Sequence, residues 1–208
     1  MSNQQRRLAA ISAQLNALKD TNNNMARSVV NLDKKWLFKQ AGHDAIVPSL
    51  LPTANFPTEI YSDLLHHTII PDPFRGMNEQ DVQWVSEKTW VYQISFNTPK
   101  IALSARKALL VFEGLDTFAT VKLNGTEVLR TENMFIRYEA DVIKFLQHDA
   151  DNILEIIFEN ATNKADAVMK SLPDHKWGTM GGDPKRTAVR KAQYHFVSAL
   201  ELFRELTR

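Results

Sequence analysis

The stretch Phe118–Arg130 reads FATVKLNGTEVLR and predicts a β-hairpin. Residues 118–123 alternate apolar and polar side chains, which is the period of a strand buried on one face. Asn124-Gly125 then gives a strong turn signal, because both central residues of a type I′ turn need positive φ. The stretch therefore predicts two antiparallel strands joined by a two-residue turn.

Further strands are predicted on both sides of this hairpin. Trp90–Phe96 alternates with aromatic side chains on one face, and Lys107–Glu113 is a nearly continuous apolar run, as in a buried strand. Met134–Tyr138 and Ile153–Phe158 are two more candidates. Many short strands separated by turn signals favour an antiparallel β-sandwich, so the fold class is predicted to be mainly β.

Helices are expected to be few and short. Residues 56–65 predict one, with Pro57 in its first turn, and residues 141–147 predict one or two helical turns. Residues 163–172 are polar and contain alanine, as in a surface helix.

Both ends of the chain differ from the middle. Residues 1–28 are interpreted as an N-terminal extension, an amphipathic helix over 8–18 followed by a polar linker, because apolar residues recur there at steps of three and four. Residues 197–208 are interpreted as a helix-like tail, with Leu202 and Leu206 four residues apart. The sandwich is assigned to residues 29–196.

Composition excludes several classes of protein. The 208 residues carry 25 Lys and Arg against 24 Asp and Glu, which argues against a dedicated nucleic-acid binder. No apolar run approaches the 18 residues of a membrane span. There is no cysteine, so disulfides and thiolate metal sites are excluded. The lack of cysteine and of an apolar leader predicts a cytoplasmic location. No cofactor is expected.

Candidate catalytic and metal-binding residues have simpler explanations. Adjacent residues on a helix point about 100° apart, so the His66 and His67 side chains are not expected to converge on one ion. Glu79 follows Asn78, a dipeptide found at glycosidase acid/base sites, but it lies in a loop. Solvent-facing strand positions explain the remaining candidates, Glu132, Glu139, Glu155 and Glu159. No metal site and no catalytic residue is predicted.

Tryptophan is the residue type most suited to stacking on a sugar. Trp90 alternates in phase with Tyr92 and Phe96, which favours core packing. Trp177 lies in the loop Asp174–Gly178 and is the better candidate for a ligand or domain contact.

An ordered series of short motifs resembles the N-terminal domain of β-mannosidases of glycoside hydrolase family 2, of the fungal intracellular type. The resemblance covers about residues 30–196. The motifs are KW-x-F at 35–38, PDPFRGMNE at 71–79, WVY at 90–92, FEGLDTFA at 112–119, LNG at 123–125, NMF at 133–135 and VRKAQYHF at 189–196.

The resemblance implies a galactose-binding-like jelly-roll sandwich that precedes a (β/α)₈ barrel. In that family the barrel holds two catalytic glutamates, and the enzyme removes terminal non-reducing β-D-mannose with retention. The N-terminal domain packs on the barrel and lends residues to the rim of the mannose pocket. The candidate substrate-binding residues at that rim are Trp177, Arg190, Lys191, Tyr194 and His195.

After Phe196 the sequence departs from the family, which continues with Gly-Trp-Asp-Trp-Gly-Pro. The 208 residues do not include the barrel, so this chain alone is expected to be inactive. The missing return strand predicts an open sheet edge and self-association through it. Carbohydrate is the expected partner in the full-length context. A stand-alone carbohydrate-binding module and a non-enzymatic scaffold that uses the helix at 8–18 are the alternatives.

Overall fold

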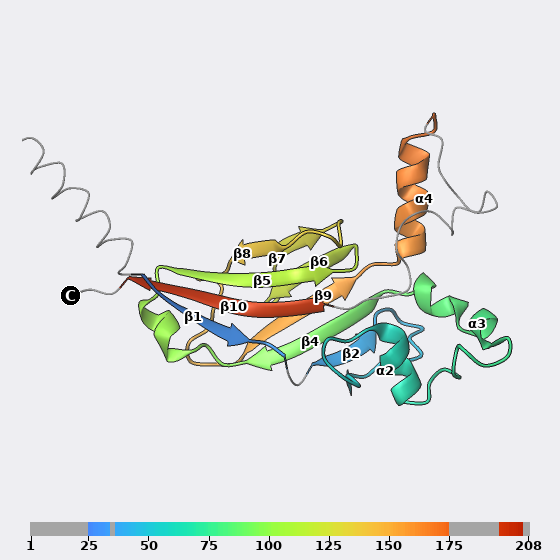
Figure 1. Cartoon of the computed structure of the whole chain (residues 1–208), viewed down its shortest axis with the longest axis horizontal. Coiled ribbons are helices and arrows are strands. Elements are labelled where there is room, and N and C mark those ends of the chain that lie inside the picture. The colour runs from blue at the N-terminus through green and yellow to red at the C-terminus, as the bar shows by residue number, and fades with distance from the viewer. Residues whose placement is uncertain (1–24, 34–35, 175–195, 206–208) are drawn as a thin grey trace, which may run out of the picture.

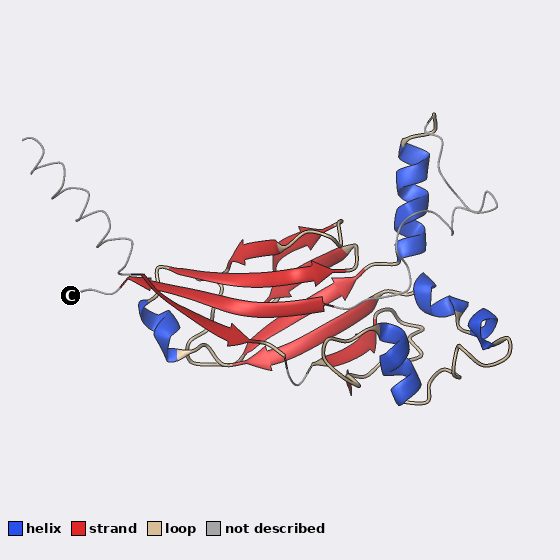
Figure 2. Cartoon of the chain, viewed as in Figure 1, coloured by secondary structure: helices blue, strands red, loops and turns tan. Residues whose placement is uncertain are grey.

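Two antiparallel sheets face each other in the computed structural model, which describes residues 25–33, 36–174 and 196–205 (Figure 1). One sheet has the order β1-β10-β5-β8 and the other β3-β2-β4-β9-β6-β7. Strands form the body of the molecule and helices lie mostly at one end (Figure 2). The strands are β1 Met25–Asn31, β2 Leu37–Gln40, β3 Leu51–Pro52, β4 Trp90–Phe96, β5 Lys107–Leu115, β6 Ala119–Leu123, β7 Thr126–Thr131, β8 Tyr138–Asp141, β9 Asn152–Phe158 and β10 Phe196–Glu205.

The predicted mainly-β sandwich is confirmed, and the helices of the described residues are short. They are α2 Ile60–His66, α3 Asn78–Asp81 and α4 Ala161–Ser171, with the 3₁₀ turns η1 Gln83–Glu87 and η2 Lys100–Ser104. Among the described residues, no helix is long and apolar enough to cross a membrane.

The core is built from the strand faces that the sequence marked as apolar. Trp90 and Tyr92 are fully buried, and the Phe38 ring lies 6.0 Å from the Tyr92 ring. Leu110 and Phe112 of β5 join the same cluster from the opposite sheet. The core-packing interpretation of Trp90 is therefore confirmed, and its indole N–H donates to the Val85 carbonyl at 2.9 Å.

The predicted hairpin is β6–β7. Asn124 and Gly125 have φ of 52° and 79°, as the turn requires. Asn124 also ties the turn to β9, because its side-chain oxygen accepts the Ile153 N–H at 2.9 Å and its amide donates to Asn152 at 2.9 Å. The turn is thus held by its backbone conformation and by side-chain hydrogen bonds.

Replacing Gly125 with valine is expected to lower the free energy of unfolding by about 1–2 kcal/mol. This is the usual cost of placing a residue that has a Cβ in the left-handed region of backbone conformation. No atom lies within 4 Å of a Cβ built at Gly125, so the cost comes from the backbone and not from a clash. Urea unfolding measures the effect. Gly125→Asn is the matched control and should lose clearly less, because asparagine tolerates positive φ. Equal losses in the two variants would contradict this explanation.

The strand predicted over Met134–Tyr138 is wrong, because these residues form a loop and β8 begins only at Tyr138. Asn133 accepts the Phe135 N–H at 2.9 Å through its side chain, which turns the chain. The Tyr138 hydroxyl accepts the N–H groups of Glu132 and Asn133 at 3.2 and 3.0 Å. These hydrogen bonds satisfy the backbone without a strand partner.

Two of the predicted helices shift or disappear. The helix predicted over residues 56–65 begins at Ile60, because the Glu59 side chain caps it by accepting the N–H groups of Tyr61 and Ser62. Residues 141–147 form only a turn, closed by a bond from the Phe145 N–H to the Val142 carbonyl at 2.9 Å. The surface helix predicted over 163–172 is confirmed as α4.

The helix-like interpretation of residues 197–208 is wrong where the structure describes them. β10 continues to Glu205 as a strand between β1 and β5, with Leu200 opposite both Val30 and Leu110. A short helix is marginal in water, whereas this strand completes two hydrogen-bonded ladders. The predicted gap beside β5 is therefore filled, and β1 and β8 are the edge strands of that sheet.

The N-terminal linker also ends earlier than predicted. Met25–Ser28 belong to β1, where they pair with residues 202–205 of β10. The helix predicted over 8–18 lies outside the described residues.

Candidate functional site

The five predicted rim residues, Trp177, Arg190, Lys191, Tyr194 and His195, lie outside the described residues. The chain that borders them is described. Phe196 pairs with Leu115, only three residues before Phe118, where a surface pocket begins. Lys164 of α4 lines the same pocket. Asp174, the last described residue before the predicted rim segment, lies beyond the other end of α4 from Lys164.

Histidine and Glu79 do not form a site among the described residues. The His66 and His67 rings touch edge to face with centroids 5.0 Å apart, and a ring nitrogen of His67 lies 2.7 Å from the Pro52 carbonyl oxygen. Glu79 is exposed on α3. Residues 25–33, 36–174 and 196–205 contain no group of three or more His, Asp or Glu side chains that could hold a metal ion.

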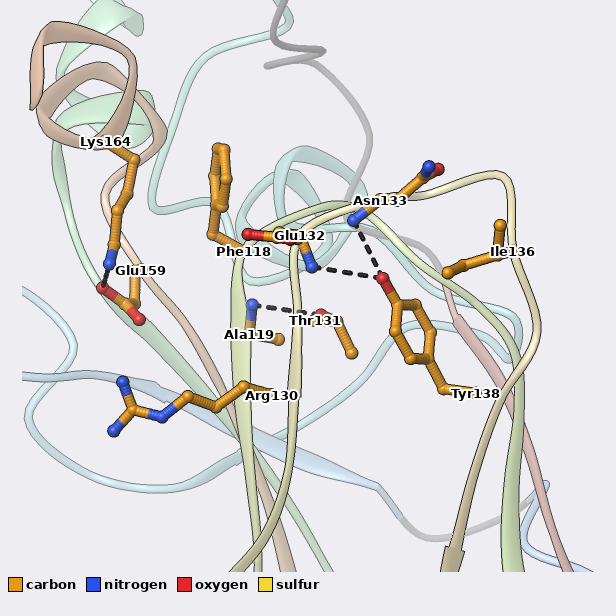
Figure 3. A pocket seen from close by; sticks show the side chains of 10 residues that line it. All are labelled: Phe118, Ala119, Arg130, Thr131, Glu132, Asn133, Ile136, Tyr138, Glu159 and Lys164. Atoms are coloured by element: carbon orange, nitrogen blue, oxygen red, sulfur yellow. Dashed lines mark hydrogen bonds and ion pairs between the residues drawn. The ribbon is translucent and has the colours of Figure 1, made fainter. Parts of the chain in front are cut away.

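The pocket lies where five elements meet at one end of the sandwich (Figure 3). The start of β6, the end of β7 with its following loop, the start of β8, the end of β9 and the helix α4 each contribute to it. Its volume is about 550 Å³. The lining residues are Phe118, Ala119, Arg130, Thr131, Glu132, Asn133, Ile136, Tyr138, Glu159 and Lys164.

Buried hydrogen bonds fix the floor of the pocket. The Thr131 hydroxyl, 5% exposed, donates to the Thr117 carbonyl at 2.9 Å and accepts the Ala119 N–H at 3.2 Å. The Tyr138 hydroxyl accepts two backbone N–H groups from the far wall, as Figure 3 shows. The backbone around the pocket is therefore held in place without any ligand.

Charges of both signs surround this floor. Lys164 and Glu159 form an ion pair at 2.8 Å. Arg130 donates two hydrogen bonds to Glu127, at 2.7 and 3.0 Å, and these raise the pKa of Arg130 and lower the pKa of Glu127. Glu132 makes no hydrogen bond or ion pair through its carboxylate with any other described residue. The two cations and two carboxylates that line the pocket balance.

Sequence reasoning identified Glu132 and Glu159 only as solvent-facing carboxylates. The structure brings them into one pocket with Phe118 and Lys164, although they are 27 residues apart in the sequence. No periodic signal could have shown this, because all four lie at the ends of strands or on the first turn of a helix. Their proximity depends on the order of strands in the sheet.

The same end of the molecule exposes large apolar side chains. Phe74 is 98% exposed in the loop before α3, and Phe135 is 81% exposed in the loop after β7. Met77 and Ile136 are exposed beside them in sequence. Both loops lie at the right-hand end in Figure 1, where α3 and α4 also lie.

Comparisons with known proteins agree on one family. Residues 36–198 match the family described as glycosyl hydrolase 2 galactose-binding domain-like. β-Mannosidase B of Thermothelomyces thermophilus is 46% identical over 170 residues, which is 82% of this chain and 19% of that protein. β-Mannosidase B of Aspergillus terreus is 42% identical over 161 residues, or 77% of this chain and 19% of the relative.

Solved structures show the same relationship. The crystal structure of β-D-mannosidase from Dictyoglomus thermophilum superposes with a TM-score of 0.70 and 30% identity, over 84% of this chain and 22% of that one. A β-glucuronidase from an uncultured Clostridium has a TM-score of 0.54 at 15% identity, over 86% of this chain and 29% of its own, and so shares only the fold.

The chain thus spans about a fifth of the length of the curated relatives that it matches. Its two facing sheets, the matched range and the identity to β-mannosidases agree with the resemblance that the motifs carry. The chain belongs to the glycosyl hydrolase 2 galactose-binding domain-like family and is homologous to the N-terminal domain of β-mannosidases.

Proposed function

We propose that this chain serves as the N-terminal sandwich of a β-mannosidase that hydrolyses terminal non-reducing β-D-mannose residues. The observation that carries the proposal is the 46% identity to β-mannosidase B over 82% of this chain. Catalysis would then require a barrel with two carboxylates placed across the glycosidic bond. In this proposal the sandwich supports that barrel and shapes the approach to its mannose pocket.

The exposed apolar loops support this role. Phe74 in the loop before α3 and Phe135 in the loop after β7 are 98% and 81% exposed, and large exposed apolar side chains can mark a surface that another protein covers. Both loops lie toward the right-hand side of the molecule in Figure 1. We propose that the rest of the enzyme docks on this end.

The pocket does not supply catalysis by itself. Glu159 is ion-paired with Lys164, and Glu132 is exposed. Neither carboxyl group lies in the enclosed apolar surroundings that turn a carboxyl group into an acid catalyst near neutral pH. The 208-residue chain is therefore expected not to hydrolyse 4-nitrophenyl β-D-mannopyranoside, as release of nitrophenol would show.

A domain exchange tests the proposal directly. We expect residues 36–198, placed in the matching region of Thermothelomyces β-mannosidase B, to give an enzyme that hydrolyses the nitrophenyl mannoside. The same enzyme without its N-terminal region is the negative control and should be inactive, because its barrel loses the surface on which the sandwich packs. A second control chimera carries Phe74→Asp and Phe135→Asp, which should impair assembly without touching the sandwich core.

An inactive chimera that is folded and has the same oligomeric state as the parent enzyme would contradict the proposal. The proposal would also be contradicted if the isolated 208-residue chain hydrolysed the nitrophenyl mannoside and Glu132→Gln abolished that hydrolysis. The alternative, a stand-alone carbohydrate-binding module, predicts sugar binding by the isolated chain and an inactive chimera.

Two further expectations belong to the same proposal. Self-association is proposed to occur through the edge strand β1, and size-exclusion chromatography over a range of protein concentrations tests it. A cytoplasmic location is supported by the cysteine-free composition, and imaging of a fluorescent fusion tests it.

A further inference from the structure

We propose that Asn124, in the turn between β6 and β7, is a deamidation site that the folded sandwich keeps closed and that unfolding opens. The reaction consumes water, releases ammonia and leaves aspartate or isoaspartate at this position. The site belongs to the sandwich itself, so the inference does not rest on the proposed function.

The Asn124-Gly125 pair supplies the reacting atoms. The deprotonated backbone nitrogen of Gly125 attacks Cγ of Asn124, a C–N bond forms, and the side-chain nitrogen leaves as ammonia. Water then opens the resulting five-membered succinimide ring at either carbonyl group, which gives aspartate or isoaspartate. Glycine favours the attack because it has no Cβ to shield the nitrogen, and Asn124 is the only asparagine of the 208 residues that precedes a glycine.

Solvent does not limit this reaction in the folded chain. Gly125 is exposed and Asn124 is half-buried, so water and hydroxide reach the turn. The Gly125 N–H donates to no other described residue, and no atom lies within 4 Å of a Cβ built at Gly125. Protection of the folded chain therefore has to come from the conformation of Asn124.

Three hydrogen bonds fix the Asn124 side chain in one position. Its oxygen accepts the Ile153 N–H at 2.9 Å, and its NH₂ group donates to the Phe145 carbonyl at 2.7 Å and to the Asn152 side-chain oxygen at 2.9 Å. Closing the ring requires this side chain to rotate toward the Gly125 nitrogen, which breaks these bonds.

The backbone of the turn opposes ring closure as well. Asn124 has a φ of 52°, in the left-handed region, where ψ is about +47°. The succinimide ring includes the bond that ψ describes and holds that angle outside the left-handed region. The turn therefore has to open locally before the ring can close, and the rate of reaction follows the population of the open form.

The product does not fit the closed turn. Deamidation replaces the donating NH₂ group of Asn124 with a second acceptor oxygen, which then faces the carbonyl of Phe145 and the side-chain oxygen of Asn152. Asn152 keeps its orientation because its own NH₂ group donates to Thr98 at 2.8 Å and to Gln147 at 3.1 Å. Isoaspartate adds one carbon to the backbone of a two-residue turn, which changes the geometry that joins β6 to β7. A chain that reacts while unfolded is therefore expected to refold less stably.

The first test compares deamidation of the folded and the unfolded 208-residue chain. The chain is incubated in mildly alkaline buffer with and without urea, circular dichroism follows its folding, and peptide mass spectrometry measures the reaction at each asparagine. We expect Asn124 to react fastest in urea and at least about tenfold more slowly without it, which corresponds to about 1.4 kcal/mol for local opening. A synthetic peptide of residues 118–130 is the control for urea itself and should react equally fast in both buffers.

A pair of variants tests the consequence of the reaction. Asn124→Asp introduces the product directly and should lower the ratio of folded to unfolded chain at least about tenfold, because two buried or half-buried acceptors lose their donor. Asn133→Asp is the matched control. Asn133 is exposed and its side-chain oxygen accepts the Phe135 N–H at 2.9 Å, so aspartate keeps that hydrogen bond and the ratio should not change. Urea unfolding measures both variants.

The results decide the proposal without reference to mannoside hydrolysis. Equal rates at Asn124 with and without urea would overturn it, since the fold would then give no protection. It would also fail if another asparagine reacted faster in the unfolded chain, or if Asn124→Asp were as stable as Asn133→Asp. An active domain-exchange enzyme together with any of these results would retain the proposed function and refute this inference.

Discussion

A chain that ends at Phe196 is expected to lose cooperative unfolding altogether. β10 lies between β1 and β5 and pairs with β1 over residues 199–205 and with β5 over residues 196–203. Each ladder hydrogen bond contributes about 0.5–1.5 kcal/mol net. The free energy lost with both ladders therefore approaches the whole free energy of unfolding of an ordinary domain, about 5–15 kcal/mol. Urea unfolding followed by circular dichroism measures the effect.

Two controls restrict the explanation to backbone pairing. A chain that ends at Glu205 removes only residues outside the described strand and should unfold like the full chain. Leu200→Pro takes one N–H from the middle of β10 and should destabilise strongly, whereas Leu200→Val keeps the N–H and should not. Hydrogen exchange of the β5 amides in the full chain should be slow. An unchanged unfolding midpoint in the chain that ends at Phe196 would show that β5 does not depend on β10.

Asp63→Ala is expected to lower the free energy of unfolding by about 3–5 kcal/mol. The Asp63 carboxylate, fully buried on α2, accepts the Ala54 N–H at 2.7 Å, the Thr58 hydroxyl at 2.7–2.8 Å and the Tyr92 hydroxyl at 2.8 Å. Alanine leaves the buried Thr58 and Tyr92 hydroxyls and the partly buried Ala54 N–H without their acceptor. Chemical unfolding of the purified variant measures the loss.

Tyr92→Phe is the matched control for Asp63→Ala. It removes one of the donors and leaves the carboxylate with the others, so about 1 kcal/mol is expected. If the two variants lose the same free energy, Asp63 does not act as the shared acceptor of this cluster.

The pH dependence of stability gives a second measurement on Asp63. Burial raises the pKa of Asp63, and the hydrogen bonds from Ala54, Thr58 and Tyr92 oppose that rise. Because the folded-state pKa lies above the unfolded value of about 3.9, the contribution of this group is complete below that value and declines as pH rises through the folded-state pKa. The stability difference between wild type and Asp63→Asn should therefore shrink over that range.

The sequence by itself determined the sandwich and most of its inner strands. Alternating apolar residues in Trp90–Phe96 and the apolar run in Lys107–Glu113 predicted β4 and β5, and Asn124-Gly125 predicted the turn of the β6–β7 hairpin. Such signals are local, because one buried face imposes a period of two and one turn imposes positive φ. The family could also be inferred from the sequence, since its motifs survive in order along the chain.

Only the tertiary structure determined that residues 197–205 form a strand, and only the tertiary structure determined which residues line the pocket. The spacing of Leu202 and Leu206 suits a helix, but β5 and β1 offer two sets of unpaired backbone groups, and pairing outweighs a weak local preference. The pocket joins Phe118 and Glu132 to Lys164 because the β6–β7 hairpin lies beside β9, which leads into α4. Contacts between residues distant in sequence depend on strand order, which no local pattern in this sequence specifies.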